Sequence, residues 1–376
     1  MTSAAAVVLR LGVATSVKIA LANLLLALAF GLWTAARIRG QVPWRKASLY
    51  PAVLLYVAAS LGAVVFSLDP GYSVRKLGDL LTLGAVPMVI TLLDREGWEK
   101  LLRLLTGVAV ASSLVGLWQY AHGASNLADR LRGLTTHYMT FSGWTLVVAL
   151  VLLGDIVFHR NRRRLLWTVP AFTVCTAALF LSYTRNAWVG LGVGLGLLAA
   201  VWKPKAFFLY PILAALLALV LPHTVLHRFV SIFDLRQPAN YDRLCMAVSA
   251  EQMVQDHPLF GVGLGMVKQR YPVYRRDDAP RWEVPHLHNN VFQITAERGI
   301  FGLAAYMAIL VVFFRHTWRA LRRRDAATFP ALAGCFLAVA GITAAGFFEY
   351  NWGDAEVWIV TLACLSAPFA LAPERE

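Results

Sequence analysis

The chain has 376 residues, of which 58% are hydrophobic and only 15% are charged, and its formal net charge is +14. This composition excludes an ordinary soluble domain and is typical of repeated transmembrane helices. In such a chain surplus Lys and Arg residues orient the loops, so we expect no nucleic-acid partner.

Two further features narrow the class of protein. The four cysteines are spread along the chain and form neither a disulfide framework nor a zinc motif. The first residues lack a charged segment followed by an apolar run and a small-residue cleavage site. We therefore expect them to belong to the mature chain.

Long apolar runs predict a polytopic, all-α transmembrane bundle. A hydrocarbon core about 30 Å thick is crossed by about 20 apolar residues in a helix. On that basis we expect roughly eleven spans and a single integral membrane domain over 1–376. The expected spans are 18–36, 48–67, 77–93, 102–120, 137–158, 165–182, 187–202, 206–222, 289–314, 329–348 and 353–371. The apolar segment 3–16 fits a half-helix, an interfacial helix or part of a twelfth span.

The connections between these spans alternate in charge. The strongly basic ones are 37–46, 159–164, 202–205 and 315–324, and the less basic ones between them are 68–76, 121–136, 183–186, 223–288 and 349–352. Loops rich in Lys and Arg remain in the cytoplasm. The less basic set is therefore expected to face outside.

The connection at 223–288 is much longer than the others. Loops of such length are usually functional or disordered. Its apolar residues recur with helical spacing in VLHRFVSIF and CMAVSAEQMV. This pattern predicts a partly helical outer loop with packed short helices.

Two arginines stand at notable positions. Arg185 lies in the short turn 183–186, where a snorkelling interfacial arginine and a functional one facing the bundle interior are about equally compatible with the spacing. Arg243 opens an amphipathic stretch that ends at the Pro and Gly residues of HPLFGVGLG. The run GVGLG lacks the strand and the Lys of a phosphate-binding loop, so a tight turn against a neighbouring helix is favoured.

The end of the loop is rich in basic and aromatic residues. The stretch 267–285 suits an anionic or sugar ligand, and equally an ordinary solvated surface. Asp277 and Asp278 lack a third ligand nearby, so we expect no metal site there.

Two histidines mark the passage from this loop into the next span. Pro285 is disfavoured inside a helix and the apolar run begins after Asn289, so either His288 or Asn289 is the expected N-cap. The helix dipole keeps a histidine ring neutral there, and a neutral imidazole can take a proton from a hydroxyl. His288 is therefore a candidate base and His286 a candidate neighbour in a cavity wall. The alternative is that both histidines are interfacial caps, which is the usual role of a lone histidine.

Two glutamates lie near or inside the apolar runs. Glu349 stands at the outer end of the span 329–348, where it can pair with an arginine, orient an acceptor or simply cap a helix. Glu297 lies about two and a half turns into the span 289–314. We expect it to be paired within the bundle and not to be catalytic.

The chain resembles the O-antigen ligase and polymerase superfamily of bacterial membrane glycosyltransferases, and most closely the O-antigen ligases. The resemblance rests on SYTRNAW, YDRLCMAVSAEQMVQDHPLFGVGLG, HLHNNVFQITAERGIFGL and FFEYNW, in that order, and on the succession of spans around one large outer loop.

The resemblance implies a GT-C-like fold and a metal-independent, inverting reaction without a cofactor. The implied partners are an undecaprenyl diphosphate-linked glycan donor, a lipid A–core acceptor and the lipids of the bacterial inner membrane, with the active site facing the periplasm. By motif, Arg185 and Arg243 correspond to donor-binding arginines and His288 to the essential histidine. We place His286, Glu349, Arg75, Lys76 and Arg132 in the same outer cavity.

Two other functions remain open. A polymerase of the same superfamily would share these site residues. A transporter or flippase for the same lipid-linked glycan would typically show paired repeats and broken helices near the midplane, which the sequence does not display.

Overall fold

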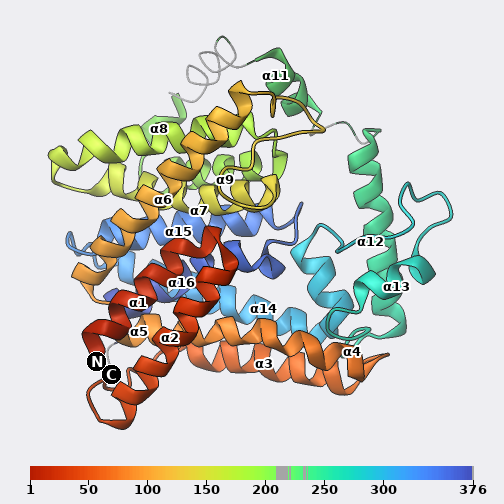
Figure 1. Cartoon of the computed structure of the whole chain (residues 1–376), viewed down its shortest axis with the longest axis horizontal. Helices are drawn as coiled ribbons and strands as arrows, with labels where there is room; N and C mark the ends of the chain where they lie inside the picture. The colour runs from red at the N-terminus through yellow and green to blue at the C-terminus, as the bar shows by residue number, and fades with distance from the viewer. Residues whose placement is uncertain (209–218, 220–221, 232–233, 235, 375–376) are drawn as a thin grey trace.

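The computed structural model describes residues 1–374 except 209–218, 220–221, 232–233 and 235. The described residues form helices and contain no β-strand, apart from one isolated bridge between Ser125 and Arg130. The protein is thus an all-α membrane bundle, as the apolar runs predict (Figure 1). The expected span 206–222 falls mostly outside the described residues.

The helices follow one another with short connections over most of the chain. The elements of the first half are α1 (Thr2–Ala14), η1 (Thr15–Val17), α2 (Ile19–Ile38), α3 (Leu49–Val65), α4 (Pro70–Val74), η2 (Arg75–Gly84), α5 (Ala85–Leu92), α6 (Arg95–Ala121), α7 (Tyr138–Phe158), η3 (Arg162–Arg164), α8 (Leu165–Leu181) and α9 (Arg185–Val201). Those of the second half are η4 (Pro204–Phe208), α11 (His223–Val230), α12 (Pro238–Asp256), α13 (Val267–Tyr274), α14 (Asn290–Arg322), α15 (Phe329–Ala345), η5 (Asn351–Gly353) and α16 (Ala355–Leu371).

Five of the described helical segments are long and apolar enough to cross a membrane: α2, α6, α7, η3 with α8, and α14. Five shorter apolar segments accompany them: α1 with η1, α3, α9, α15 and α16. The span expected at 77–93 is not one continuous α-helix. It is a 3-10 segment, η2, followed by the eight-residue α5.

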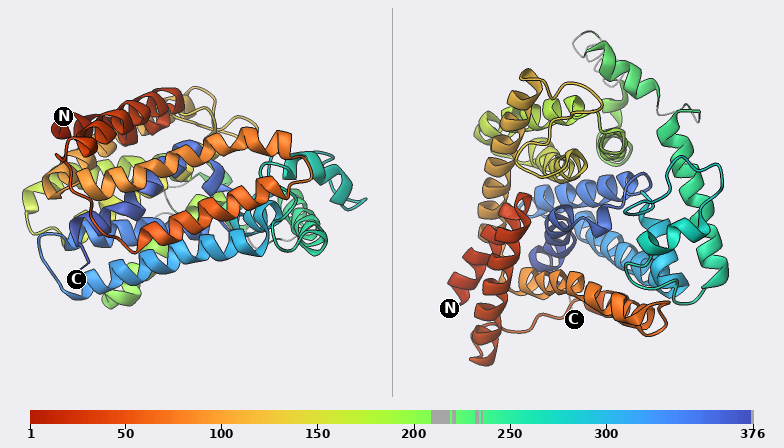
Figure 2. Two further views of the ribbon diagram at one scale, coloured as in Figure 1. Left: turned by 90° about the horizontal axis from the view of Figure 1, so that it is seen from below. Right: turned by 45° about the vertical axis from the view of Figure 1, so that its right-hand side comes forward.

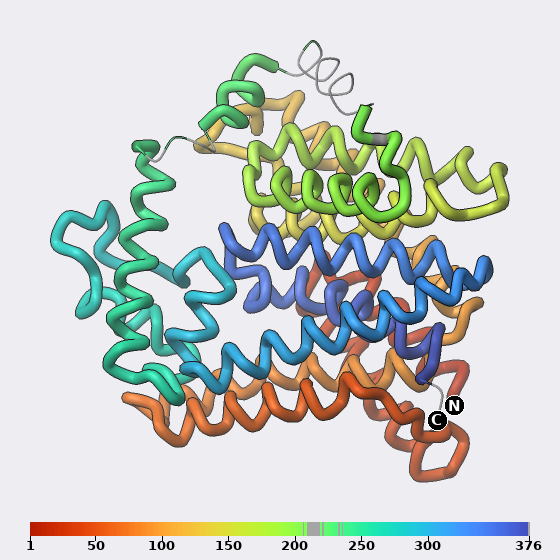
Figure 3. Tube along the Cα trace, turned by 180° about the vertical axis from the view of Figure 1, so that it is seen from behind, coloured from red at the N-terminus to blue at the C-terminus, as the bar shows by residue number. Residues whose placement is uncertain are grey.

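The first helix belongs to the bundle. The segment 3–16 forms α1, which packs against α2 and α6. The two chain termini lie at the same end of the bundle, opposite α4, α12 and α13 (Figures 1 and 3).

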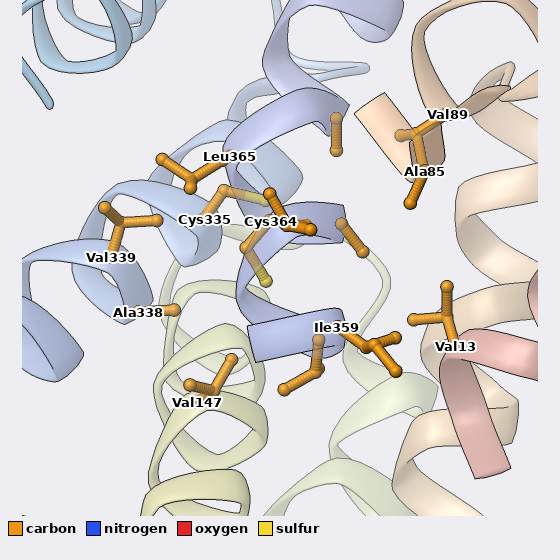
Figure 4. Packing of buried hydrophobic residues seen from close by; sticks show 14 of the residues in the cluster. Val13, Ala85, Val89, Val147, Cys335, Ala338, Val339, Ile359, Cys364 and Leu365 are labelled. Atoms are coloured by element: carbon orange, nitrogen blue, oxygen red, sulfur yellow. The ribbon is translucent and has the colours of Figure 1, made fainter. Parts of the chain in front are cut away.

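The centre of the bundle is formed by α15 and α16. α15 packs against α7 and α9, and α16 packs against α5 (Figure 2). Small residues permit this close packing, because a Cβ added to Gly154 of α7 would lie 2.4 Å from Cα of Gly334 in α15. Figure 4 shows the apolar side chains at this junction, among them Val147, Cys335 and Cys364. All four cysteines are buried and free.

The long connection 223–288, called the outer segment below, forms short packed helices over its described part, as expected. Residues of α12, α13 and the connections around them share a small core with α14, built on Met246, Met253, Val267 and Tyr271. The predicted tight turn after α12 is also present, and it lies against α14. Gly261 has φ +69°, and a Cβ there would lie 2.4 Å from the carbonyl oxygen of Ala296.

The helix α14 is interrupted where this turn meets it. Gly299 has φ 62° and ψ −163°, so the helix kinks there. The kink lets the backbone of α14 bond the turn: Val262 N donates to Ala296 O at 2.8 Å, and Ile300 N donates to Pro258 O at 2.9 Å. The outer segment is therefore fixed to a membrane helix at this point.

Glu297 is paired inside the bundle, which confirms the sequence expectation. Its carboxylate accepts hydrogen bonds from Gln293 and Arg298, both at 2.8 Å. Arg298 also donates to Ser60 at 3.1 Å and lies over the ring of Tyr56. These contacts join α14 to α3 and account for the buried charge of Glu297.

Candidate active site

His288 and Glu349 form a hydrogen-bonded pair at the outer end of α14. His288 Nδ1 lies 2.9 Å from Oε2 of Glu349, and both side chains are almost fully buried. The N-cap of α14 is Asn289, whose side chain accepts from Phe292 N, so His288 directly precedes the cap. The backbone of His288 has φ +48°, a left-handed conformation that is strained for histidine.

Hydrogen bonds between the start of α14 and the segment that follows α15 hold His288 and Glu349 close together. Asn290 N donates to Gly346 O at 2.7 Å, and Trp352 N donates to the side chain of Asn290 at 3.1 Å. Asn289 donates to Phe347 O at 2.9 Å. Side-chain amides are well suited to this task, since each offers both a donor and an acceptor.

His286 lies beside the pair. Its Nε2 is 3.5 Å from Oε1 of Glu349, and its ring centre is 4.3 Å from that of His288. Burial lowers the pKa of His286 to about 4, so its ring is neutral near pH 7. Burial alone would raise the pKa of Glu349, but the hydrogen bond from His288 and the electrostatic interactions with the rings of His288 and His286 lower it overall.

These three side chains open on a polar cavity of about 570 Å³. Its wall includes the guanidinium groups of Arg130, Arg228, Arg243 and Arg281. Arg281 is paired with Asp242. The other three make no ion pair within the described part of the chain, so the cavity has positive charge available for an anion.

Arg243 is the predicted donor-binding residue that lines the cavity. It lies in the second turn of α12, and its Nε is buried without a hydrogen-bond partner among the described residues. Burial lowers the pKa of Arg243 and those of Arg130 and Arg228, because each guanidinium is partly removed from water. An anion in the cavity would supply the missing contacts.

Arg185 faces the interior, which is one of the two alternatives that its position in the sequence allows. It is buried at the start of α9 and does not line the cavity. It donates to Ser231 O at 2.8 Å and to Oδ1 of Asn240 at 2.7 Å. Arg185 thus joins the end of α11 to the start of α12, the two helices that carry Arg228 and Arg243 of the cavity wall.

Three expected cavity residues lie elsewhere. Arg75 and Arg132 are exposed, and neither lines the cavity. Lys76 lies along Gly265, with its ammonium group 5.7 Å from the ring centre of Tyr72. Charge and loop position alone suggested these residues, and neither fixes the direction of a side chain.

Sequence reasoning missed several residues of the cavity wall. They are Arg130, His137, Tyr138, Arg228, Arg281 and Asp354. Arg130 lies over the ring of Tyr138, with 4.3 Å from its guanidinium carbon to the ring centre. His137 and Asp354 also cap α7 and α16. None of these residues stands in a local motif, although the pairing of arginine with aromatic residues was a usable signal.

One group in the cavity has the composition of a metal site. The donor atoms of His286, His288 and Glu349 all lie within 4.8 Å of one another. This spacing permits all three to bind one ion. That the reaction needs no metal stays a prediction.

Comparison with known proteins bears on the class of enzyme. The family model for O-antigen ligase matches residues 170–307. The matched segment contains Arg185, Arg243, His286 and His288, but not Glu349 or the loop that carries Arg130. No curated protein matches the chain. The resemblance is confirmed by this match: residues 170–307 are similar to the O-antigen ligase family, which supports a relation to the O-antigen ligase and polymerase superfamily.

Proposed function

We propose that the protein transfers a glycan from undecaprenyl diphosphate to a sugar hydroxyl of a lipid A–core acceptor, on the periplasmic face of the bacterial inner membrane. The family match supports a glycosyltransferase of ligase or polymerase type. The observation that carries the proposal is the His288–Glu349 pair, which borders a cavity lined with arginines.

His288 serves as the general base. Because the carboxylate of Glu349 can only accept a hydrogen bond, it holds the proton of the neutral ring on Nδ1. The lone pair is then on Nε2, where it can take the proton of the acceptor hydroxyl. Glu349 also stabilises the imidazolium that this transfer creates.

The arginines stabilise the leaving group. The acceptor oxygen attacks the anomeric carbon from the face opposite the diphosphate, forming a glycosidic bond as the bond to the phosphate oxygen breaks. The electron pair remains on the diphosphate, whose charge grows in the transition state. Arg130, Arg228 and Arg243 line the cavity where such an anion would bind. Arg185 is a positioning residue between α11 and α12.

A second cavity suits the lipid part of a substrate. It has about 830 Å³, is lined mainly by apolar residues of α2, α3, η2 and α5, and shares Tyr350 and Gly353 with the polar cavity. A chain of isoprene or acyl units in it would place a charged head group beside His288.

The test uses purified protein in proteoliposomes with a lipid-linked donor, a lipid A–core acceptor and excess EDTA. We expect glycan on the acceptor, detected by mass spectrometry. Activity that disappears in EDTA and returns with a divalent ion would contradict a metal-free reaction. A lengthening lipid-linked chain would identify a polymerase. Movement of the lipid between leaflets with its linkage intact would identify a transporter.

A further inference from the structure

The three side chains beside the polar cavity can act as a set of metal ligands. The donor atoms are Nε2 of His286, Nδ1 of His288 and the carboxylate of Glu349, all within 4.8 Å of one another. Two imidazoles and one carboxylate are the donor set of many open zinc sites. Mg²⁺ and Ca²⁺ prefer sites built from oxygen atoms, so they fit this group less well.

The distances agree with tetrahedral zinc coordination. Bonds of about 2.0–2.1 Å at tetrahedral angles place neighbouring ligand atoms about 3.3 Å apart. The two nitrogen-to-oxygen distances here are 2.9 Å from His288 to Oε2 of Glu349 and 3.5 Å from His286 to its other oxygen, Oε1. They lie on either side of that value, so small side-chain movements would suffice to bind the ion.

The site is also held in place before any ion binds. Glu349 is 5% exposed and His288 is 9% exposed. The hydrogen bonds that Asn290 makes with Gly346 and Trp352 fix the two segments relative to each other. Binding would therefore order little of the chain. The fourth coordination position would face the cavity and accept water or an anion.

We propose that His286, His288 and Glu349 form a zinc site, and that zinc bound there inhibits the enzyme by occupying its base. Zinc would bind Nδ1 of His288 in place of the proton that Nδ1 otherwise donates to Glu349, so this hydrogen bond is lost. The single proton of the neutral ring would then reside on Nε2, which could no longer accept the proton of a hydroxyl.

Two features of the site oppose the ion and limit its affinity. His288 N donates to Nδ1 of His286 at 3.4 Å, and this long contact is lost when His286 binds zinc through Nε2 with its proton on Nδ1. The guanidinium groups of Arg243 and Arg281 line the same cavity and repel a cation. Their charge favours an anion as the fourth ligand.

The binding test uses tag-free, full-length protein in detergent, stripped with EDTA and then titrated with Zn²⁺ against a chromophoric chelator. We expect saturation at a single zinc per chain, and a visible absorption band of tetrahedral Co²⁺ when Co²⁺ replaces it. His286→Gln and Glu349→Gln should each weaken binding by at least about tenfold, since even outer-shell changes cost that much. Size-exclusion chromatography and thermal unfolding verify that each variant is folded.

The matched control is His137→Ala, which removes a histidine of the same cavity that is not in the group. It should leave zinc affinity unchanged. The proposal is overturned if binding never saturates, if the His286 and Glu349 variants bind as tightly as the original chain, or if His137→Ala weakens binding equally.

The inhibition test rests on the proposed function, whereas the binding test does not. Zn²⁺ should suppress glycan transfer, EDTA should restore it, and His286→Gln should shift the inhibitory concentration upward by at least about tenfold. Zinc binding without inhibition would overturn the regulatory claim. Absence of any transfer, with zinc binding intact, would instead contradict the proposed function.

Discussion

His288 Nδ1 is hydrogen-bonded to Oε2 of Glu349 at 2.9 Å across 61 positions of sequence. A carboxylate on one ring nitrogen determines which nitrogen of a neutral histidine is free. The pair thus resembles the histidine and carboxylate of a catalytic triad, in which the carboxylate orients the ring and stabilises its charged form.

Loss of either partner should reduce turnover more than substrate binding. We expect His288→Asn to lower kcat by at least about 10²-fold, because a positioned base contributes about 10²–10⁴. Glu349→Gln should lower kcat as well, since an amide can donate to Nδ1 and select the wrong tautomer. Steady-state transfer assays in proteoliposomes measure both. The exposed His122 provides the control, and comparable loss in His122→Ala would contradict the assignment.

The two arginines of the loop before α7 should differ sharply in function. Arg130 lines the cavity, whereas Arg132 is exposed outside it. Arg130→Ala should weaken productive donor binding by about 10- to 100-fold. This is the loss expected when one hydrogen bond from a charged group, which contributes about 1.5–3 kcal/mol, is removed. Arg132→Ala should have little effect. The measurement is kcat/KM for the donor, and equal losses in the two variants would argue against the cavity as the diphosphate site.

Arg228 and Arg243 should behave as Arg130 does, with Lys substitutions recovering part of the loss. A Lys restores the charge but not the fork geometry that matches two phosphate oxygens. Full activity of Arg243→Lys would indicate that charge alone suffices there.

Arg185 should act through the outer segment and not through direct donor contact. Arg185→Ala removes the bonds to Ser231 and Asn240, so amide hydrogen exchange should accelerate at α11 and the first turn of α12. Exchange at α14 should not change. A variant that loses activity while the exchange of α11 and α12 stays constant would instead place Arg185 in the donor site.

The kink in α14 should depend on glycine. A Cβ at Gly299 would lie 2.2 Å from the backbone of Leu259, at a φ of +62°. Gly299→Ala should therefore destabilise the protein by more than about 1–3 kcal/mol, the cost of this backbone conformation alone in a residue other than glycine. In contrast, Gly196→Ala in α9 meets no neighbour and should be neutral or slightly stabilising. Thermal unfolding in detergent compares the two variants.

Removal of one partner of the buried Glu297–Arg298 pair should be costly. Glu297→Gln leaves the charge of Arg298 uncompensated, and such changes cost about 3–5 kcal/mol. Replacing both residues, as in Glu297→Gln with Arg298→Met, should cost less than the sum of the two single changes. An additive result in thermal unfolding would show that the two charges do not interact.

The fold was largely predictable, because apolar runs and helix breakers are local signals. The site was predictable only where a motif marks it. His288 and Arg243 stand in such motifs, and Glu349 follows a recognisable apolar run. Arg130 lies in a loop and Arg228 in the short helix α11, neither in a motif, and their approach to α12 depends on how distant helices pack. The prediction of one continuous span over 77–93 is wrong, because composition alone does not distinguish an α-helix from a 3-10 segment.

The left-handed backbone of His288 bears on when the imidazole ring becomes oriented. Such a conformation costs about 1–3 kcal/mol in a residue other than glycine. The hydrogen bonds from Asn289 to Phe347 O and from Asn290 N to Gly346 O hold it in place. Folding, and not the arrival of substrate, therefore orients the ring. For the base that we propose, the entropy of alignment is lost once, when the chain folds, and each turnover then begins from a preorganised nitrogen.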